Sequence, residues 1–367
     1  MNQDAALTVR YWGTTGSIPR PLTPEAMAAK VARVLRALRD PELANAWAAL
    51  PDTEEAALAF VKSRLAASLH STAGGNSTCI EIEAGDQCLL VDAGSGLRVW
   101  GDAVQRRQAT LANNAAPLHA HLFLTHAHLD HLIGISACDP FFRPQNDVTI
   151  WASASVIHRL HGLLQRPEHQ RSPLSGVTLG HLAAIRNWNV LEHNAIVQIG
   201  DTVVEAFACN HPGEALAYRF ERLGRSVVIA TDHEHLTMPD ERLAQFAHDA
   251  DLVYMDAQYG QCEYKGEEGI GEGEPQSRQG WGHGTFEACI ETALHARCHR
   301  LHLGHHDPQR DDEGLETLEQ LAKLHLAQRL ESRVDDSSTL EVELAREGTS
   351  ISLSPLESHG ITPCPAD

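Results

Sequence analysis

The amino-acid sequence predicts a layered α/β domain with a largely apolar interior. Short apolar runs of the kind that form strands alternate with stretches whose apolar residues recur every three or four positions, the period of a helix. Hydrophobic residues make up 43% of the chain and aromatic residues only 5%, which is typical of an α/β protein built from Leu, Val, Ile and Ala. The 367 residues allow one large domain with insertions or two smaller domains.

The chain begins with a strand and then turns helical. A strand is predicted at residues 7–12, followed by a turn at residues 13–17. Residues 23–69 are rich in Ala and Leu at helical spacing, and with their connections they form a helical insertion of about residues 20–70. Breaks between helices are expected at the two Asp/Pro pairs, Asp40-Pro41 and Pro51-Asp52.

Strands dominate again from residue 79 onward. They are predicted within residues 79–85, 87–96, 121–126, 147–153, 196–210, 216–222, 226–232 and 251–257. Helices are predicted within residues 153–164, 239–247 and 286–296. We find no repeat of fixed period, although a sheet flanked by helices can be duplicated without leaving one.

Two segments are expected to lie outside the packed structure. Residues 258–280 are rich in Gly and Glu and predict a mobile surface loop. Residues 346–367 contain Ser, Pro and Gly with little apolar content and predict a disordered tail, so that the folded domain spans residues 1–345.

The charge and the cysteines restrict the partners and the compartment. The formal net charge of −20 and the absence of a basic run argue against binding of extended nucleic acid, whereas a small anionic substrate fits if bound cations reverse the local field. No apolar run is long enough to span a bilayer, and no secretory leader is visible. The eight cysteines lack paired spacing and are interpreted as reduced thiols. A cytoplasmic protein is therefore expected.

A dense group of potential metal ligands follows the strand predicted at residues 121–126. Within six residues the chain places His126, His128, Asp130 and His131. Because alternate side chains of an extended segment share one face, His126 and His128 can point the same way. Imidazoles with one carboxylate are typical of sites that hold Zn²⁺ and keep a position open for water.

Three distant residues occur in the same context as this group. Each is a His or Asp at the end of an apolar run: His211, Asp232 and His305. Since converging strand ends place side chains at one edge of a sheet, these residues are predicted to complete the site. We choose His305 over its neighbour His306 because His305 keeps the register of the preceding strand.

These motifs resemble the metallo-β-lactamase superfamily. The resemblance rests on THAHLDH, NHPG, ATD and LGHHDP in this order, while GGNSTCIEI, LLVDAGSG, DAQY and WGHGTFEA are similar to its phosphodiesterase branch, which includes cyclic-phosphate phosphodiesterases and ribonuclease Z. It covers roughly residues 7–18 and 74–312. It implies a four-layer αβ/βα metallo-β-lactamase sandwich, to which this chain adds the N-terminal helical insertion.

The resemblance also implies the roles of the ligands in a site for two divalent metal ions, with zinc first and manganese or iron as alternatives. The implied first set is His126, His128 and His211, the second set is Asp130, His131 and His305, and Asp232 bridges both. A hydroxide between the two ions would then be the nucleophile, because coordination lowers the pKa of water. Asp130 could also orient that hydroxide.

The motif WGHGT adds an implied proton donor. His283 precedes a predicted helix and could protonate a leaving alkoxide, with Asp256 holding its tautomer and raising its pKa. The branch usually has Ser where this chain has Gly284, so a hydroxyl contact is absent from that position. Asp92 resembles a carboxylate that supports a ligand. Residues 74–76 form either a wall of the site or a plain turn.

The sequence thus favours a phosphodiesterase that acts on a small phosphodiester, cyclic ones included. Two alternatives stay open: a lactonase, thioesterase or other ester or amide hydrolase of the same fold, and a non-catalytic module that senses or binds a ligand through its metals. The helical insertion could cap the site, form a homodimer contact or be a solvated appendage. No basic arm for tRNA is visible in the chain.

Overall fold

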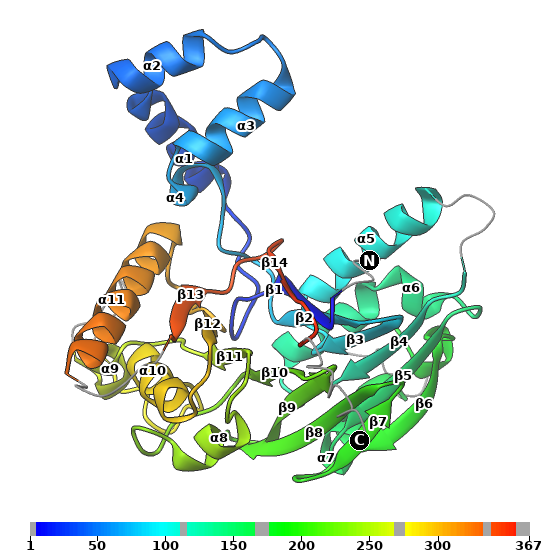
Figure 1. Ribbon diagram of the computed structural model, residues 1–367. Coiled ribbons are helices and arrows are strands. Elements are labelled where there is room, and N and C mark those ends of the chain that lie inside the picture. The colour runs from blue at the N-terminus through cyan, green and yellow to red at the C-terminus, as the bar shows by residue number, and fades with distance from the viewer. Residues whose placement is uncertain (1–4, 111–115, 166–175, 268–275, 333–338, 357–367) are drawn as a thin grey trace, which may run out of the picture.

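Two seven-stranded sheets form the centre of the protein (Figure 1). The structure is a computed structural model, and it describes residues 5–110, 116–165, 176–267, 276–332 and 339–356. The first sheet contains, in spatial order, β14 (Ser350–Leu353), β1 (Leu7–Gly13), β2 (Cys79–Ala84), β3 (Gln87–Val91), β4 (His119–Phe123), β5 (Asp147–Ala152) and β6 (Ile185–Val190). The second contains β7 (Ile196–Ile199), β8 (Thr202–Cys209), β9 (Ala215–Arg222), β10 (Arg225–Ala230), β11 (Leu252–Asp256), β12 (Arg300–Gly304) and β13 (Glu341–Leu344).

Both sheets follow the same pairing plan. In the first, the pairs from β14 to β3 are antiparallel and those from β3 to β6 are parallel. In the second, the pairs from β7 to β10 are antiparallel and those from β10 to β13 are parallel. Each sheet with its helices is called a half below. The duplication that the sequence does not reveal as a repeat is therefore present in the strand topology.

Apolar side chains fill the space between the sheets and the space under the helices. Val9 and Ile82 of the first sheet share one buried cluster with Phe220 and Ile229 of the second. The other face of each sheet is covered by helices, whose bounds are α5 (Gly96–Thr110), α6 (Asp139–Phe142), α7 (Ala154–Leu164), α8 (Glu241–Phe246), α10 (Phe286–His295) and α11 (Asp312–Glu331). This is the four-layer αβ/βα sandwich that the sequence predicts.

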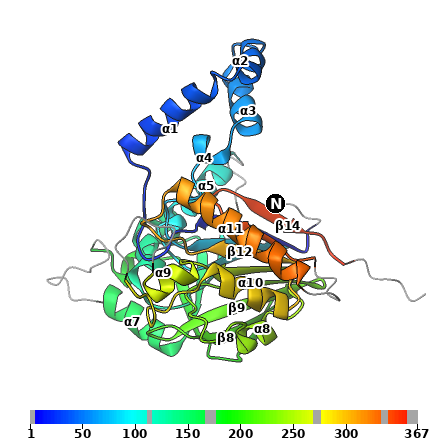
Figure 2. The ribbon, with the colours of Figure 1, turned by 90° about the vertical axis from the view of Figure 1, so that its left-hand side faces the viewer.

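The predicted N-terminal helices form an arm that stands away from the sandwich (Figures 1 and 2). Its helices are α1 (Pro24–Ala37), α2 (Pro41–Ala48), α3 (Glu54–Arg64) and α4 (Ala67–His70). The first three begin at side-chain N-caps, namely Thr23, Asp40 and Thr53. The prolines at positions 41 and 51 lie at the breaks between helices, as expected.

Two ion pairs connect helix α1 of this arm to the start of α11. Lys30 lies 2.8 Å from Asp312 and donates to the carbonyl of Ser71, and Arg33 pairs with Glu313. The outward side of α1 stays apolar: Met27, Val31 and Leu35 are 52%, 53% and 62% exposed.

The prediction of a disordered tail from residue 346 is wrong for its first part. Residues 350–353 form β14, which pairs with β1 from Leu7 opposite Leu353 to Arg10 opposite Ser350. The free edge of β1 supplies the hydrogen bonds, and the alternation of Ile351 and Leu353 toward the core is too short to stand out in the sequence. Residues 357–367 lie outside the described residues.

The prediction of a mobile loop at residues 258–280 is also wrong in part. Gln258 and Tyr259 are buried, and α9 (Gln261–Lys265) is a short helix. Glu263, one of the residues that suggested a solvated loop, accepts from the backbone N–H of Gly260 and pairs with buried Arg310. Residues 268–275 lie outside the described residues. Across the described residues, no helix combines the length and apolar character needed to cross a bilayer.

Candidate metal centre

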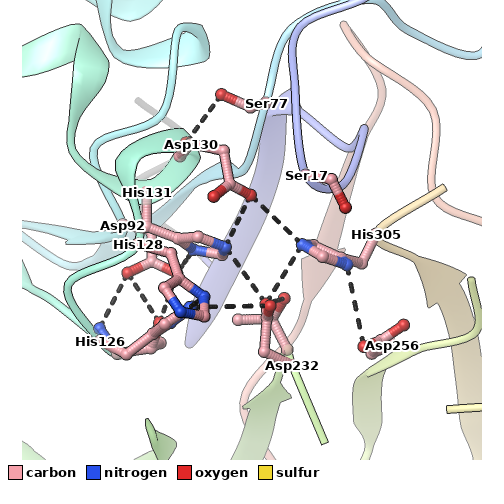
Figure 3. Close-up of polar contacts among 12 residues, drawn as sticks. Ser17, Ser77, Asp92, His126, His128, Asp130, His131, Asp232, Asp256 and His305 are labelled. Carbon is pink, nitrogen blue, oxygen red and sulfur yellow. Dashed lines mark hydrogen bonds and ion pairs between the residues drawn. The ribbon is translucent and has the colours of Figure 1, made fainter. Parts of the chain in front are cut away.

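The loop after β4 carries the first group of polar side chains to the edge of the first sheet (Figure 3). His126 and His128 follow the strand in extended backbone, and Asp130 and His131 lie in a short 3-10 turn (Leu129–His131). The turn is held from outside by Ser77, whose hydroxyl donates to the carbonyl of Asp130 at 2.7 Å. The backbone after this turn packs closely against Gly94. Position 134 must therefore be a glycine, because a Cβ there would lie 2.0 Å from the carbonyl oxygen of Gly94.

Four side chains converge at one end of the site. The Nε2 atoms of His126 and His211 lie 2.9 and 3.1 Å from Nδ1 of His128. Oδ2 of Asp232 lies 3.7 Å from Nε2 of His126 and 3.9 Å from Nε2 of His211. The ligand atoms of these four residues all lie within 4.8 Å of one another, a spacing that a single cation can bridge.

A second group shares Asp232 with the first. Oδ1 of Asp232 lies 3.2 Å from Nε2 of both His131 and His305. Oδ2 of Asp130 lies 3.1 Å from Nε2 of His131 and 3.6 Å from Nε2 of His305. Figure 3 shows Asp232 between the two groups, with His305 opposite the loop of residues 126–131. The structure therefore brings together all seven residues that the sequence selected as ligands.

In His131 and His211, Nδ1 makes a hydrogen bond outside the cluster, and this bond orients the ring so that Nε2 lies within the cluster. Nδ1 of His131 donates to Asp92 at 2.7 Å, and Nδ1 of His211 donates to the carbonyl of Gly282 at 2.8 Å. Asp92 is held in turn by the backbone N–H and the hydroxyl of Thr125. In the neutral form, this hydrogen bonding leaves Nε2 free of a proton and able to bind metal. Burial would lower the pKa of His131, but the charges of Asp130, Asp232 and Asp92 raise it well above its usual range, so a bound cation would displace the proton from Nε2.

The chemistry of the donor set fits a pair of divalent cations. Nε2 of His131 and Nε2 of His305 are buried and make no hydrogen bond of normal geometry in the described structure. Removal from water, nearly complete for His126 and partial for His128 and His211, lowers the pKa values of these three imidazoles and favours the neutral form that binds metal. Burial would raise the pKa of Asp232, but the surrounding His305, His131 and His126 hold it well below its usual range. A buried carboxylate among five imidazoles is the arrangement a shared metal ligand requires.

Three of the site residues have a backbone conformation that is uncommon for L-amino acids. Asp92, Asp232 and His305 have φ values of 61°, 52° and 53°. Asp92 and His305 are the first residues after β3 and β12, and Asp232 is the second residue after β10. Strain at several neighbouring positions is typical of functional sites.

His283 and Asp256 form a hydrogen-bonded pair beside the cluster. Nδ1 of His283 donates to Oδ2 of Asp256 at 2.8 Å and lies 3.9 Å from Oδ2 of Asp232. Burial would lower the pKa of His283, but the charge of Asp256 and its hydrogen bond outweigh burial and raise the pKa to about 9. Because Asp256 engages Nδ1, Nε2 is the nitrogen left to contact a substrate.

The other sequence candidates are also placed. His306 donates from Nε2 to the carbonyl of Ala345 and faces away from the cluster, whereas His305 lies within it. In residues 74–76, the backbone N–H groups of Gly75 and Asn76 donate to Glu347.

Sequence reasoning missed two residues that hold the site in place. The hydroxyl of Tyr254 accepts from the backbone N–H of His305 at 2.8 Å, and Glu234 binds the turn before His283. Tyr254 lies within a predicted strand and Glu234 is one of many glutamates, so neither has a local sequence pattern that marks it.

Comparisons with known proteins agree with the fold. The family model of the beta-lactamase superfamily domain matches residues 88–306, which is more than half of the chain. Among solved structures, yeast PDE1 superposes with a TM-score of 0.58 at 13% identity, covering 95% of this chain and 100% of that one. A diphosphatase of the PhnP family gives 0.53 at 14% identity, with 95% and 98% covered, and the short form of human tRNase Z gives 0.50 at 16%, with 94% and 99% covered.

At such low identities these structures demonstrate the fold alone. No curated protein sequence matches the chain, so its relationship is established by the family model and by the sandwich architecture. On both grounds the chain belongs to the metallo-β-lactamase superfamily.

Proposed function

We propose that this chain is a binuclear metal-dependent phosphodiesterase that cleaves a small phosphodiester, cyclic ones included. The observation that carries the proposal is the hydrogen-bonded pair of His283 and Asp256 beside a seven-residue cluster of metal-ligand type. A metal cluster alone serves many hydrolases of this fold. A fixed proton donor next to it is suited to a leaving alkoxide, which needs a proton as the bond to phosphorus breaks.

Two cations bound here would supply Lewis acidity and a nucleophilic hydroxide at neutral pH. His126, His128 and His211 would hold one ion, Asp130, His131 and His305 the other, and Asp232 would contact both. The carboxylate of Asp130 faces the side chains of His131 and His305 and can orient a water molecule between the two groups. Zinc suits this set of imidazoles and carboxylates, and manganese or iron are alternatives.

The role of His283 follows from its hydrogen bond. Asp256 accepts from Nδ1, so the proton available for catalysis is on Nε2. The elevated pKa of about 9 keeps that proton in place at neutral pH until a stronger base, such as a departing alkoxide, develops. Asp256 also fixes the plane of the ring, because its carboxylate is buried at 1% exposure and cannot swing away.

The charge distribution supports a small anionic substrate. The net charge of −20 repels long polyanions, whereas bound cations at the cluster attract a single phosphate group. His128 is exposed at the rim, so a ligand of modest size can reach the cluster from solvent. In the arm, Lys30 and Arg33 already pair with acidic residues of α11, which leaves less basic surface for a nucleic acid.

The test compares His283→Ala with the wild type on p-nitrophenyl methyl phosphate and phenyl methyl phosphate. The variant should lose about 10²- to 10⁴-fold in kcat/KM with the phenyl ester, whose leaving group needs the proton, and much less with the p-nitrophenyl ester. His295→Ala, at the far end of α10, is the matched control and should behave as the wild type. Equal loss with both esters would contradict the acid role.

The same proteins should be assayed on a lactone, a thioester and a β-lactam. A wild type that prefers one of these and tolerates His283→Ala would be an ester or amide hydrolase of the same fold. A protein with two metals per chain and no turnover on any of them, yet with tight binding of a small anion, would be a sensing module.

A further inference from the structure

Glu234 occupies a buried position that the proposed chemistry does not use. It lies two residues after Asp232 and is 5% exposed. Its Oε1 accepts from the backbone N–H of Gly280 at 2.7 Å and from the hydroxyl of Tyr264 at 2.6 Å, and its Oε2 accepts from the backbone N–H of Gly282 at 2.9 Å. These three hydrogen bonds compensate the burial of the carboxylate.

The turn that Glu234 holds contacts both the metal cluster and the proton donor. The carbonyl of Gly282 accepts from Nδ1 of His211, and His283 is the next residue along the chain. Gly280 and Gly282 have φ values of +80° and +88°, a conformation that favours glycine. A Cβ at position 282 would meet Nδ1 of His211 at 2.2 Å, so the backbone must approach this ligand closely.

The backbone of Glu234 is itself fixed to the segment that carries His211. Its N–H donates to the carbonyl of Asn210 at 2.9 Å, and the amide of Asn210 donates back to the carbonyl of Glu234 at 2.9 Å. Glu234 therefore connects three segments: the one after β8, the one after β10, and the turn before α10. A turn with two left-handed glycines has little stiffness of its own, so its position depends on this carboxylate.

We propose that Glu234 is a positioning residue that holds the turn of residues 280–283 and thereby sets the tautomer of His211 and the place of the His283 imidazole. The inference rests on the proposed function for its effect on proton donation, but its effect on metal binding is independent of the substrate. Removal of the carboxylate should loosen both groups together, since a single turn carries the carbonyl that fixes His211 and the imidazole of His283.

The test uses Glu234→Gln, Glu234→Ala and Tyr264→Phe in the full chain. Zinc affinity, measured by competition with a chromogenic chelator, should fall by about 10- to 100-fold in Glu234→Ala, less in Glu234→Gln, which keeps one acceptor oxygen, and least in Tyr264→Phe. The ratio of kcat/KM between the p-nitrophenyl and phenyl esters should rise in the same order, because a displaced His283 protonates the leaving group poorly. In a His283→Ala background this ratio should no longer respond to Glu234→Gln.

Glu81→Gln is the matched control. Glu81 is also a buried carboxylate, 2% exposed, but its partners include Trp12, Trp100 and Arg10. None of these residues belongs to the seven-residue cluster or to the turn before His283, so substitution of Glu81 should leave both zinc affinity and the ester ratio unchanged. If Glu234→Ala and Glu81→Gln have the same zinc affinity, the positioning role is refuted. If the wild type turns over neither ester, the phosphodiesterase proposal fails, and zinc affinity still decides the role of Glu234.

Discussion

The two halves of the molecule share one strand plan but contribute to the site in different ways. The first half supplies His126, His128, Asp130 and His131 from a single loop after β4. The second half supplies one ligand from each of three connections: His211 after β8, Asp232 after β10 and His305 after β12. The comparison shows that one architecture can present potential ligands either as a compact motif or as scattered residues, and that residues from both halves form the candidate metal centre.

A pair of aspartates makes the comparison more specific. Asp92 follows β3 and Asp232 follows β10, the strands at which the first and second sheets change from antiparallel to parallel pairing. Both have positive φ, 61° and 52°. Asp232 reaches the cluster directly, whereas Asp92 contacts it through His131. Corresponding strands of the two sheets are therefore each followed by an aspartate with positive φ, one inside the cluster and one that supports it through His131.

The largest effect is expected where the halves meet. Asp232→Ala removes a carboxylate that lies 3.2 Å from Nε2 of both His131 and His305, so both ions should be lost. Activity should fall by at least about a thousand-fold, since metal assistance supplies several kcal/mol of transition-state stabilisation. Elemental analysis of the purified variant and initial rates on p-nitrophenyl methyl phosphate measure the two losses. Two zinc ions per chain in Asp232→Ala would show that neither ion needs Asp232.

A smaller effect should separate the two adjacent histidines of the second half. His305→Ala should lose one ion and about 100-fold or more in kcat/KM, a loss of roughly 3 kcal/mol. His306→Ala removes only a hydrogen bond to the carbonyl of Ala345 and should keep both ions. Metal stoichiometry and thermal denaturation of both variants, run side by side, provide the measurement. The reverse result would transfer the ligand role to His306.

Substitution of two supporting carboxylates, one from each half, should affect different properties of the site: zinc affinity for Asp92 and proton donation for Asp256. Asp92→Asn should weaken zinc binding by about 10- to 100-fold, because it disturbs the tautomer of His131. Asp256→Asn should retain zinc but slow the phenyl ester, and the alkaline limit of activity should move to lower pH. The acid form of His283 is present below its pKa, which Asp256 raises to about 9, and is lost as pH rises through it. An unchanged alkaline limit in Asp256→Asn would contradict this assignment.

The smallest effect concerns stability alone. Leu353→Ala truncates a side chain of β14 that is 9% exposed and packs in the cluster between the sheets. Because the edge strand can relax, the cost should be about 2 kcal/mol of unfolding free energy, with activity unchanged. Urea denaturation followed by circular dichroism measures it, and Leu356→Ala, which removes an exposed side chain, is the control. A loss of activity in folded Leu353→Ala would show that the edge strand influences the site.

The sequence predicted the first-half ligands from local pattern and the second-half ligands only from context. Four potential ligands within six residues are visible without any knowledge of the fold. His211, Asp232 and His305 could be selected because each follows an apolar run, and the family resemblance then gave them roles. The sandwich itself was predictable because alternating strands and helices at their own periods are encoded locally.

What the sequence could not give depends on contacts between distant segments. Strand β14 exists because the edge of β1 is open, and a four-residue strand has too little alternation to be recognised. Glu263 suggested a solvated loop, but its partner Arg310 lies far along the chain and is buried with it. Glu234 accepts hydrogen bonds from backbone N–H groups of Gly280 and Gly282. Because nearly every residue type carries a backbone N–H, the sequence does not show which of them pair with this carboxylate.

The pairing of β14 with β1 has a consequence for how the molecule is made. Leu7 and Leu353 are partners across the sheet although nearly the whole chain separates them. During synthesis on the ribosome, the edge of β1 stays unpaired until β14 emerges. Pairing of β14 with β1 then closes a loop of more than three hundred residues. Exposed strand borders promote association between chains. Nascent or truncated forms that end before residue 350 should therefore be the ones that need a chaperone.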